Sequence, residues 1–250
     1  MSRNISMKIS AKGLHYRALN EKIHQLVASG VKSLHVTHVN GQRYIGGGLQ
    51  GNIRITIDGV PGNDLAAFMD GPKIRVKGNA QDGVANTMNA GEVIIDGNAG
   101  DVLGYGMRGG RVFIRGNVGY RVGIHMKSYG KQMPVMVVGG SARDFLGEYQ
   151  AGGVIIVLGL ELPPEEPIAG YMVGTGMHGG VMYVRGKVED WQIGKEVKIF
   201  EIDDKDRKIM LPHLRDFARA FRLELEDILS QPFLKMVPYS KRPYGRIYAY

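Results

Sequence analysis

Residues 174–180, "GTGMHGG", have the G-x-G-x-x-G spacing of loops that bind the pyrophosphate of a dinucleotide. That chemistry needs a helix that begins at the loop, because the helix N-terminus holds the phosphates. Here the loop leads instead into "VMYV", residues 181–184, which favours a strand. A near copy, "GYGMRGG", occupies residues 104–110 and also precedes a strand-like run. The recurrence indicates a structural turn rather than a cofactor site.

The histidines do not form a metal site by their spacing. His35 and His38 lie three residues apart on a segment that alternates like a strand, so their side chains should face opposite sides. His178 lies inside the glycine-rich turn, and Arg108 takes its place in the earlier copy. We therefore interpret His178 as a turn residue.

Three aspartates, Asp82, Asp101 and Asp144, stand at similar offsets in successive segments. Such a row could bind cations. Aspartate beside glycine more often forms turns, because its carboxylate accepts hydrogen bonds from nearby backbone N–H groups. We favour the turn interpretation.

Nucleophilic chemistry has little support. The chain has no cysteine, which excludes disulfides, cysteine-bound zinc, iron–sulfur clusters and a thiol nucleophile. No serine lies in a G-x-S-x-G elbow. The segment "GIHMKS", residues 123–128, has Met126 where a phosphate-binding loop needs glycine. We predict no catalytic, cofactor-binding or metal-binding residue on this chain.

A repeat organises the sequence. Short apolar runs end in Gly59, Gly78, Gly97 and Gly116, always nineteen residues apart. The series continues at Gly139, Gly159 and Gly186, with intervals of 23, 20 and 27 residues. Regular repetition of this length is typical of solenoids, in which each repeat packs against its neighbours.

Two columns of the repeat should form one buried face of the strands. Two residues before each glycine, every residue is β-branched: Ile57, Val76, Ile95, Ile114, Val137, Val157 and Val184. Four residues before, every residue is apolar: Ile55, Ile74, Val93, Val112, Val135, Ile155 and Met182. The sequence predicts a mainly β protein, a parallel β-helix of about seven coils. An antiparallel sandwich is the alternative, but no Asn-Gly hairpin joins neighbouring runs.

Glycine makes up 37 of the 250 residues, about twice the usual share of roughly 7%. We expect it at the corners of the coils, where φ is positive or a side chain would clash. The predicted turn glycines are Gly59, Gly78, Gly97, Gly104, Gly106, Gly109, Gly116, Gly139, Gly159, Gly174, Gly176, Gly179 and Gly186.

The two ends differ from the repeat, and solenoids need capped ends. Residues 19–29 carry a helical apolar stripe, and "SLHVTHV" then alternates as a strand. Residues 213–229, after Pro212, again have helical spacing. We divide the chain into an N-terminal helix–strand cap, residues 1–50, the β-helix, residues 51–199, and a C-terminal helix with a basic and aromatic tail, residues 200–250.

The outward column becomes apolar in the later coils. Met136, Val138, Ile156 and Leu158 are expected to face outward, so a terminal helix or a partner protein should cover them. The tail, residues 239–250, mixes basic residues with tyrosines, as in segments that stack on nucleic-acid bases. We prefer a packed arm, because no RNA-binding module surrounds the tail.

Charge and hydropathy indicate where the protein works. The net charge is +8, but the basic residues are spread along the chain, so we expect no nucleic-acid partner. The N-terminus lacks the apolar run of a signal peptide, and no stretch is long enough to span a membrane. We expect a cytoplasmic protein without a membrane partner, and its self-association into a homo-oligomer is left open.

Four segments carry a resemblance to a known family. "GNAGDVLGYGMRGGRVFIRGNVGYRVGI", "VVGGSARDFLGEYQAGGVIIVLG" and "VGTGMHGGVMYVRG" resemble the GXGXG domain that closes the large subunit of glutamate synthase. "NGQRYIGGGLQG", residues 40–51, is similar to the segment that leads into that domain. The resemblance covers about residues 40–199. The C-terminal helix and "RPYG" look like the version encoded as a separate, archaeal-type polypeptide.

The resemblance implies a right-handed β-helix with a structural role. It implies that glutaminase chemistry belongs to an amidotransferase chain, and reductive amination of 2-oxoglutarate to a chain with FMN and an iron–sulfur cluster. This chain would bind no cofactor, brace those partner chains and help to shape the ammonia path between them. The scaffold subunit of formylmethanofuran dehydrogenase, which has the same coil pattern, is the nearest alternative. A free-standing β-helix hydrolase or lyase would need an acidic or Ser/Asp/His cluster, which the sequence does not supply.

Overall fold

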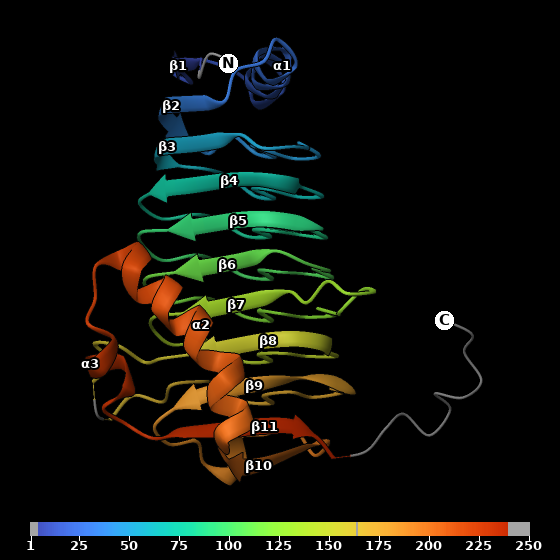
Figure 1. Cartoon of the computed structure of the whole chain (residues 1–250), viewed down its shortest axis with the longest axis vertical. Helices are drawn as coiled ribbons and strands as arrows, with labels where there is room; N and C mark the ends of the chain where they lie inside the picture. The colour runs from blue at the N-terminus through green and yellow to red at the C-terminus, as the bar shows by residue number, and fades with distance from the viewer. Residues whose placement is uncertain (1–4, 164, 240–250) are drawn as a thin grey trace, which may run out of the picture.

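The computed structural model describes residues 5–163 and 165–239 as an elongated stack of coils (Figure 1). One sheet of 11 strands runs along the stack in the order β1 to β9, then β11, then β10. The strands are β1 (Ser6–Ser10), β2 (Ser33–Asn40), β3 (Arg54–Val60), β4 (Asp70–Lys77), β5 (Ala90–Ile95), β6 (Arg111–Ile114), β7 (Val135–Val138), β8 (Ala151–Val157), β9 (Gly179–Arg185), β10 (Val197–Glu201) and β11 (Phe233–Pro238). The helices are α1 (Tyr16–Ala28), α2 (Asp204–Phe221), α3 (Leu225–Leu229) and the short 3-10 helix η1 (Asp190–Gln192).

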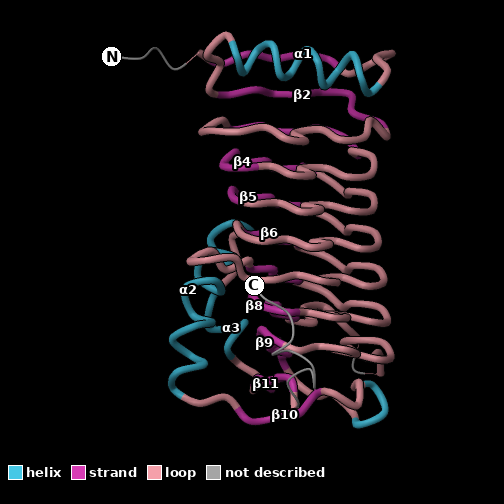
Figure 2. The backbone as a smooth tube through the Cα atoms, turned by 90° about the vertical axis from the view of Figure 1, so that its right-hand side faces the viewer, coloured by secondary structure: helices cyan, strands magenta, loops and turns pink. Residues whose placement is uncertain are grey.

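Strands β1 to β9 pair with one another in parallel throughout, which confirms the predicted parallel β-helix. The solenoid has about six turns, slightly fewer than the predicted seven. The repeat begins at β3 and ends at β9. These seven strands enclose six intervals, and each interval is one turn. Figure 2 shows the loops of successive coils stacked in register along the same axis.

Outside β7, the two predicted columns fill the interior of the solenoid. Ile55 lies opposite Ile74, and Ile57 opposite Val76, and the same pairing continues to β6 and again between β8 and β9. All four side chains are buried. Each strand is too short to be stable alone, so the stacking of its apolar face on the neighbouring coils stabilises the fold.

The fifth coil has a different register from the predicted one. Ile114 lies opposite Val138, one residue later than the alignment on Gly139 predicts, so that Gly140 is the equivalent glycine. Because side chains alternate along a strand, this slip turns Met136 and Val138 into the interior core. The prediction that Met136 and Val138 face outward is therefore wrong. The prediction that Val135 and Val137 face the interior is wrong for the same reason, because both lie in the outer cluster under α2. Either register buries two apolar side chains, so the pattern of this strand alone does not choose between them.

The outward apolar patch exists and is covered within the chain. Ile156 and Leu158 face outward, as predicted, and form a second core with the apolar side of α2. The rings of Phe113 and Phe217 meet edge to face, with centroids 5.9 Å apart. Figure 1 shows α2 lying across the strands from β6 onward. A terminal helix, one of the two predicted covers, therefore shields this half of the sheet.

The C-terminal helix begins earlier than predicted. It starts at Asp204 and contains Pro212, instead of starting after it. The carboxylate of Asp203 accepts hydrogen bonds from the N–H groups of Lys205 and Asp206, which fixes the start of the helix. The helix stops at Arg222, whose backbone is left-handed, and the rest of the predicted helix is the separate α3. The prediction of one helix over residues 213–229 is wrong in both respects.

The ends are capped by different devices. Helix α1 buries Leu19 and Ile23 against the first coil, and Asn20 Nδ2 donates to the Arg43 carbonyl over 2.8 Å. At the other end β11 pairs antiparallel with both β9 and β10, which ends the parallel stack. The sheet crosses the predicted boundaries at residues 50 and 199 without interruption. Of the predicted arm, only Tyr239 is among the described residues, where Lys198 Nζ lies 3.7 Å from the centre of its ring.

Candidate partner-binding surface

The segments that come just before the strands in the chain form one side of the solenoid, and their backbone is unusual. In each of seven successive segments, one before each of the strands β3 to β9, three residues at alternate positions adopt left-handed φ angles. We call these residues the left-handed ladder: Tyr44, Gly46 and Gly48; Asp64, Ala66 and Phe68; Gly83, Ala85 and Thr87; Val102, Gly104 and Gly106; Arg121, Gly123 and His125; Phe145, Gly147 and Tyr149; Met172, Gly174 and Gly176. Many are not glycine, although a left-handed backbone is rare for other residues.

Hydrogen bonds between coils stabilise this conformation. The N–H groups of Val102 and Gly106 donate to carbonyls of the following coil, over 2.8 and 2.9 Å. The N–H of Gly104, between them, donates to the Val84 carbonyl of the preceding coil over 2.8 Å. The ladder therefore joins the coils through a second hydrogen-bond network, apart from the β-sheet.

The middle residue of each ladder segment is glycine or alanine because it faces the core. A Cβ at Gly104 would lie 2.7 Å from Met136 Cε, and one at Gly147 would lie 2.5 Å from Met182 Sδ. Three residues beyond the middle position, a buried column continues from coil to coil: Leu49, Met69, Met88, Met107, Met126, Gln150 and Met177. The interior is thus closed on this side as well.

Exposed aromatic side chains lie at the outward positions of the ladder or directly beside them. We call Tyr105, His125 and Tyr149 the aromatic row. The rings of His125 and Tyr149 are stacked, with centroids 5.2 Å apart and planes 10° apart, and Tyr105 meets His125 edge to face at 5.8 Å. Tyr105 and Tyr149 are 42% and 38% exposed. Aromatic residues arranged on a rigid, accessible surface are typical of protein interfaces.

An ion pair between Arg121 and Glu148 supports the aromatic row. Glu148 is buried, and its Oε2 accepts a hydrogen bond from Arg121 Nη1. The guanidinium carbon of Arg121 lies 4.4 Å from the centre of the Phe145 ring. The Arg121 side chain is held by its ion pair with Glu148 and by its contact with the Phe145 ring. These contacts restrain the backbone on both sides of His125.

The comparisons with known proteins agree with this geometry. The model of the GXGXG motif family matches residues 28–239, which include the whole left-handed ladder. The chain belongs to the GXGXG family. The resemblance to the C-terminal domain of the glutamate synthase large subunit is confirmed at the level of the family, whereas the link to formylmethanofuran dehydrogenase is not confirmed.

A full-length relative of this GXGXG chain is also known. It is the uncharacterised protein MJ1350 of Methanocaldococcus jannaschii, 48% identical over 249 residues, which covers 96% of this chain and 95% of the relative. Its printed name assigns it no activity.

The predicted turn glycines of this GXGXG chain fall into two groups. Eight have positive φ: Gly59, Gly78, Gly104, Gly106, Gly159, Gly174, Gly176 and Gly186. The other five, Gly97, Gly109, Gly116, Gly139 and Gly179, lack it, and a Cβ on each would collide with an oxygen of the preceding coil. At Gly97, for example, that oxygen is Asn79 Oδ1. The segment "GTGMHGG" leads into β9, so no helix N-terminus follows it.

The aspartate row makes inter-coil bonds. Asp82 Oδ1 accepts from the N–H of Asp101, Asp101 Oδ1 from that of Tyr120, and Asp144 Oδ1 from that of Tyr171, each over 2.9 Å. The predicted turn role is thus corrected, because the carboxylates bond to the following coil instead of their own turn. Among the described residues, no three His, Cys, Asp or Glu side chains gather as a metal site.

The histidines of the first coils have separate partners. His35 Nε2 lies 2.6 Å from Asp58 Oδ2, and His38 Nδ1 lies 3.3 Å from Ser10 Oγ. Burial alone would raise the pKa of Asp58, but the hydrogen bond and charge of His35 and the charge of Lys77 hold it below its usual range. The structure does not bring His35 and His38 together with His178.

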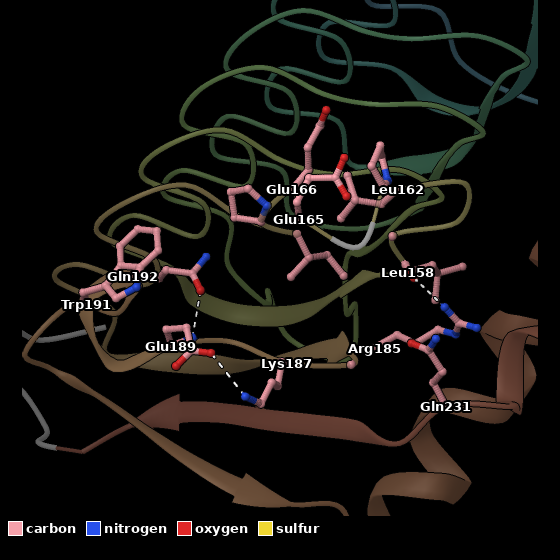
Figure 3. A pocket seen from close by; sticks show the side chains of 15 residues that line it. Leu158, Leu162, Glu165, Glu166, Arg185, Lys187, Glu189, Trp191, Gln192 and Gln231 are labelled. Carbon is pink, nitrogen blue, oxygen red and sulfur yellow. Dashed lines mark hydrogen bonds and ion pairs between the residues drawn. The ribbon is translucent and has the colours of Figure 1, made fainter.

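A hollow of about 730 Å³ lies between the end of β9 and residues 159–163 and 165–168 (Figure 3). Its cation Arg185 donates to the carbonyls of Ile228 and Leu158, over 2.9 and 3.4 Å. Burial lowers the pKa of this arginine. Lys187 pairs with Glu189 over 3.5 Å. The two cations of the hollow are thus engaged by backbone carbonyls and by Glu189, while the carboxylates of Glu165 and Glu166 also line it.

Within residues 5–163 and 165–239, no helix is both long and apolar enough to cross a bilayer.

Proposed function

We propose that this chain is a structural subunit of a multi-chain glutamate synthase, which converts glutamine, 2-oxoglutarate and reductant into two glutamates. The observation that carries the proposal is the match of the GXGXG family model to residues 28–239, the family of the glutamate synthase C-terminal domain. In this proposal the chain binds no cofactor and works in the cytoplasm. An amidotransferase chain supplies the glutaminase, and a second chain carries FMN and the iron–sulfur cluster.

The fold suits a brace between two catalytic chains. The coils are joined twice, by the parallel sheet and by the left-handed ladder, so the rod resists bending at any one coil. Its interior is filled by buried apolar side chains. An ammonia path that this chain helps to shape would therefore run along its outer surface, against a partner, and not through the coils.

Purification from the native host tests this proposal. A tagged chain should bring down a glutaminase-like chain and a flavin and iron–sulfur chain, both identified by mass spectrometry. The complex should consume 2-oxoglutarate in a glutamine-dependent reaction. Recovery of the chain with formylmethanofuran dehydrogenase subunits, or of a lone chain with hydrolase or lyase activity, would reject the proposal.

A further inference from the structure

A finger projects from the solenoid beside the aromatic row. Residues 127–133, "KSYGKQM", form a tight turn in which the backbones of Tyr129 and Gln132 exchange two hydrogen bonds of 3.1 and 2.9 Å. Tyr129 at the tip is 67% exposed, and Lys127 and Lys131 flank it. In Figure 1 this loop extends beyond the neighbouring turns at the start of β7.

The finger is tied to the same coils as the aromatic row. The N–H of Lys127 donates to the Met107 carbonyl over 3.0 Å, and Ser128 Oγ accepts from the Gly153 N–H over 3.1 Å. Lys127 follows His125 by two residues. The finger and the row thus form one continuous surface, which we call the basic aromatic patch: Tyr105, His125, Lys127, Tyr129, Lys131 and Tyr149.

The charge of this patch is positive. Lys127 and Lys131 are exposed, and no ion pair engages them within the described residues. Of the nearby carboxylates, Glu148 pairs with Arg121, and Glu196 Oε2 accepts the Gly176 N–H beside the Tyr149 ring over 3.2 Å, so Lys127 and Lys131 leave the surface with more cations than carboxylates. An acidic surface would complement these cations.

The rings of the row favour a protein over a nucleic acid. Tyr149 stacks on His125, and its ring also lies against Gly176, where a Cβ would collide with it. Bases bind aromatic residues by stacking on open ring faces, and the contacts with His125 and Gly176 reduce the open face of the Tyr149 ring. Ring edges and tyrosine hydroxyls remain, which suit contacts with carboxylates and backbone groups.

The other side of these coils is already occupied, because α2 covers the outer face of the sheet there. We propose that the basic aromatic patch docks an acidic surface of a protein chain of the glutamate synthase. This inference rests on the proposed function and adds to it the face that is bound and the charge of its partner.

The experiment compares variants of the whole chain for binding to the co-purified partner chains. The double variant Lys127→Glu with Lys131→Glu should bind at least about tenfold more weakly, and binding of the unaltered chain should weaken with added salt. Lys22→Glu, an exposed charge reversal on α1, is the matched control and should bind normally. Circular dichroism and thermal unfolding should show the same fold for all three.

The outcomes separate the two proposals. If the unaltered chain binds both partners and the double variant binds equally well, the patch is the wrong face while the proposed function stands. If the unaltered chain binds neither partner, the proposed function fails and the partner named here fails with it. If the unaltered chain instead retards single-stranded RNA in a gel and the double variant does not, the patch binds nucleic acid and the protein partner is rejected.

Discussion

The ring of Tyr149 lies against the backbone of Gly176 in the next coil, at the place where a Cβ on Gly176 would overlap its Cδ1 and Cε1 atoms. Gly176 is also left-handed, with φ of +68°. This contact links the exposed aromatic row to the glycine pattern of the family. It explains why this position needs glycine, whereas the equivalent positions in earlier coils carry Tyr149 itself and His125.

Gly176→Ala should therefore destabilise the chain by about 3 kcal/mol, from left-handed strain and from displacement of the tyrosine ring. Gly48→Ala is the matched control, because Gly48 has φ of +64° in the same ladder position but no atom within 4 Å of its Cβ site. It should cost only about 1 kcal/mol. Urea unfolding measures both, and equal losses would contradict the steric role of Tyr149.

Pro212→Ala should stabilise the protein. Pro212 lies inside α2, where it removes a backbone donor, and its side chain is exposed, so its replacement leaves no cavity. Proline in a helix interior costs up to about 3 kcal/mol relative to alanine. We expect a gain of about 1 to 3 kcal/mol in the free energy of unfolding. A loss of stability would show that α2 needs the bend at this residue.

Asp206 should make stability depend on acid. Burial alone would raise its pKa, but hydrogen bonds from the Asp203 N–H, Lys235 and Tyr183 outweigh burial and hold it below the usual range. The stabilisation is therefore complete above the unfolded pKa of about 4, and is lost as pH falls through the lower folded pKa.

Asp206→Asn should lower stability at pH 7 by about 3 kcal/mol, because Lys235 loses the carboxylate 2.9 Å away. The loss should shrink below pH 4. Urea unfolding of both proteins between pH 7 and pH 3 tests this, and parallel pH profiles would show that Asp206 does not contribute to the acid dependence.

Met136 tests the register of the fifth coil. It lies in the interior and is fully buried, so Met136→Gln should place an amide without partners in the core and cost about 2 to 4 kcal/mol. Met133→Gln, on the exposed finger, should change stability by less than about 0.5 kcal/mol. Thermal unfolding measures both variants. Equal stability of the two would show that Met136 faces outward.

Much of the fold follows from local patterns. The nineteen-residue spacing and the β-branched columns predict parallel stacking, since equivalent side chains must lie over one another. The start of α2 was less predictable, because Pro212 suggests a helix start while the stronger signal is the pair Asp203 and Asp206. The register of β7 was not predictable from its own residues, because Gly139 and Gly140 offer equivalent alignments.

The aromatic row was the feature that the sequence predicted least. Glycine at residues 104 and 174 predicts left-handed turns, but Arg121, His125, Phe145 and Tyr149 adopt the same conformation without any such preference. The sequence by itself determined the repeat, the two buried strand columns outside β7 and the absence of cysteine chemistry. Only the tertiary structure decided which exposed rings meet, because hydrogen bonds from the neighbouring coils hold those residues in a backbone conformation that they would not adopt alone.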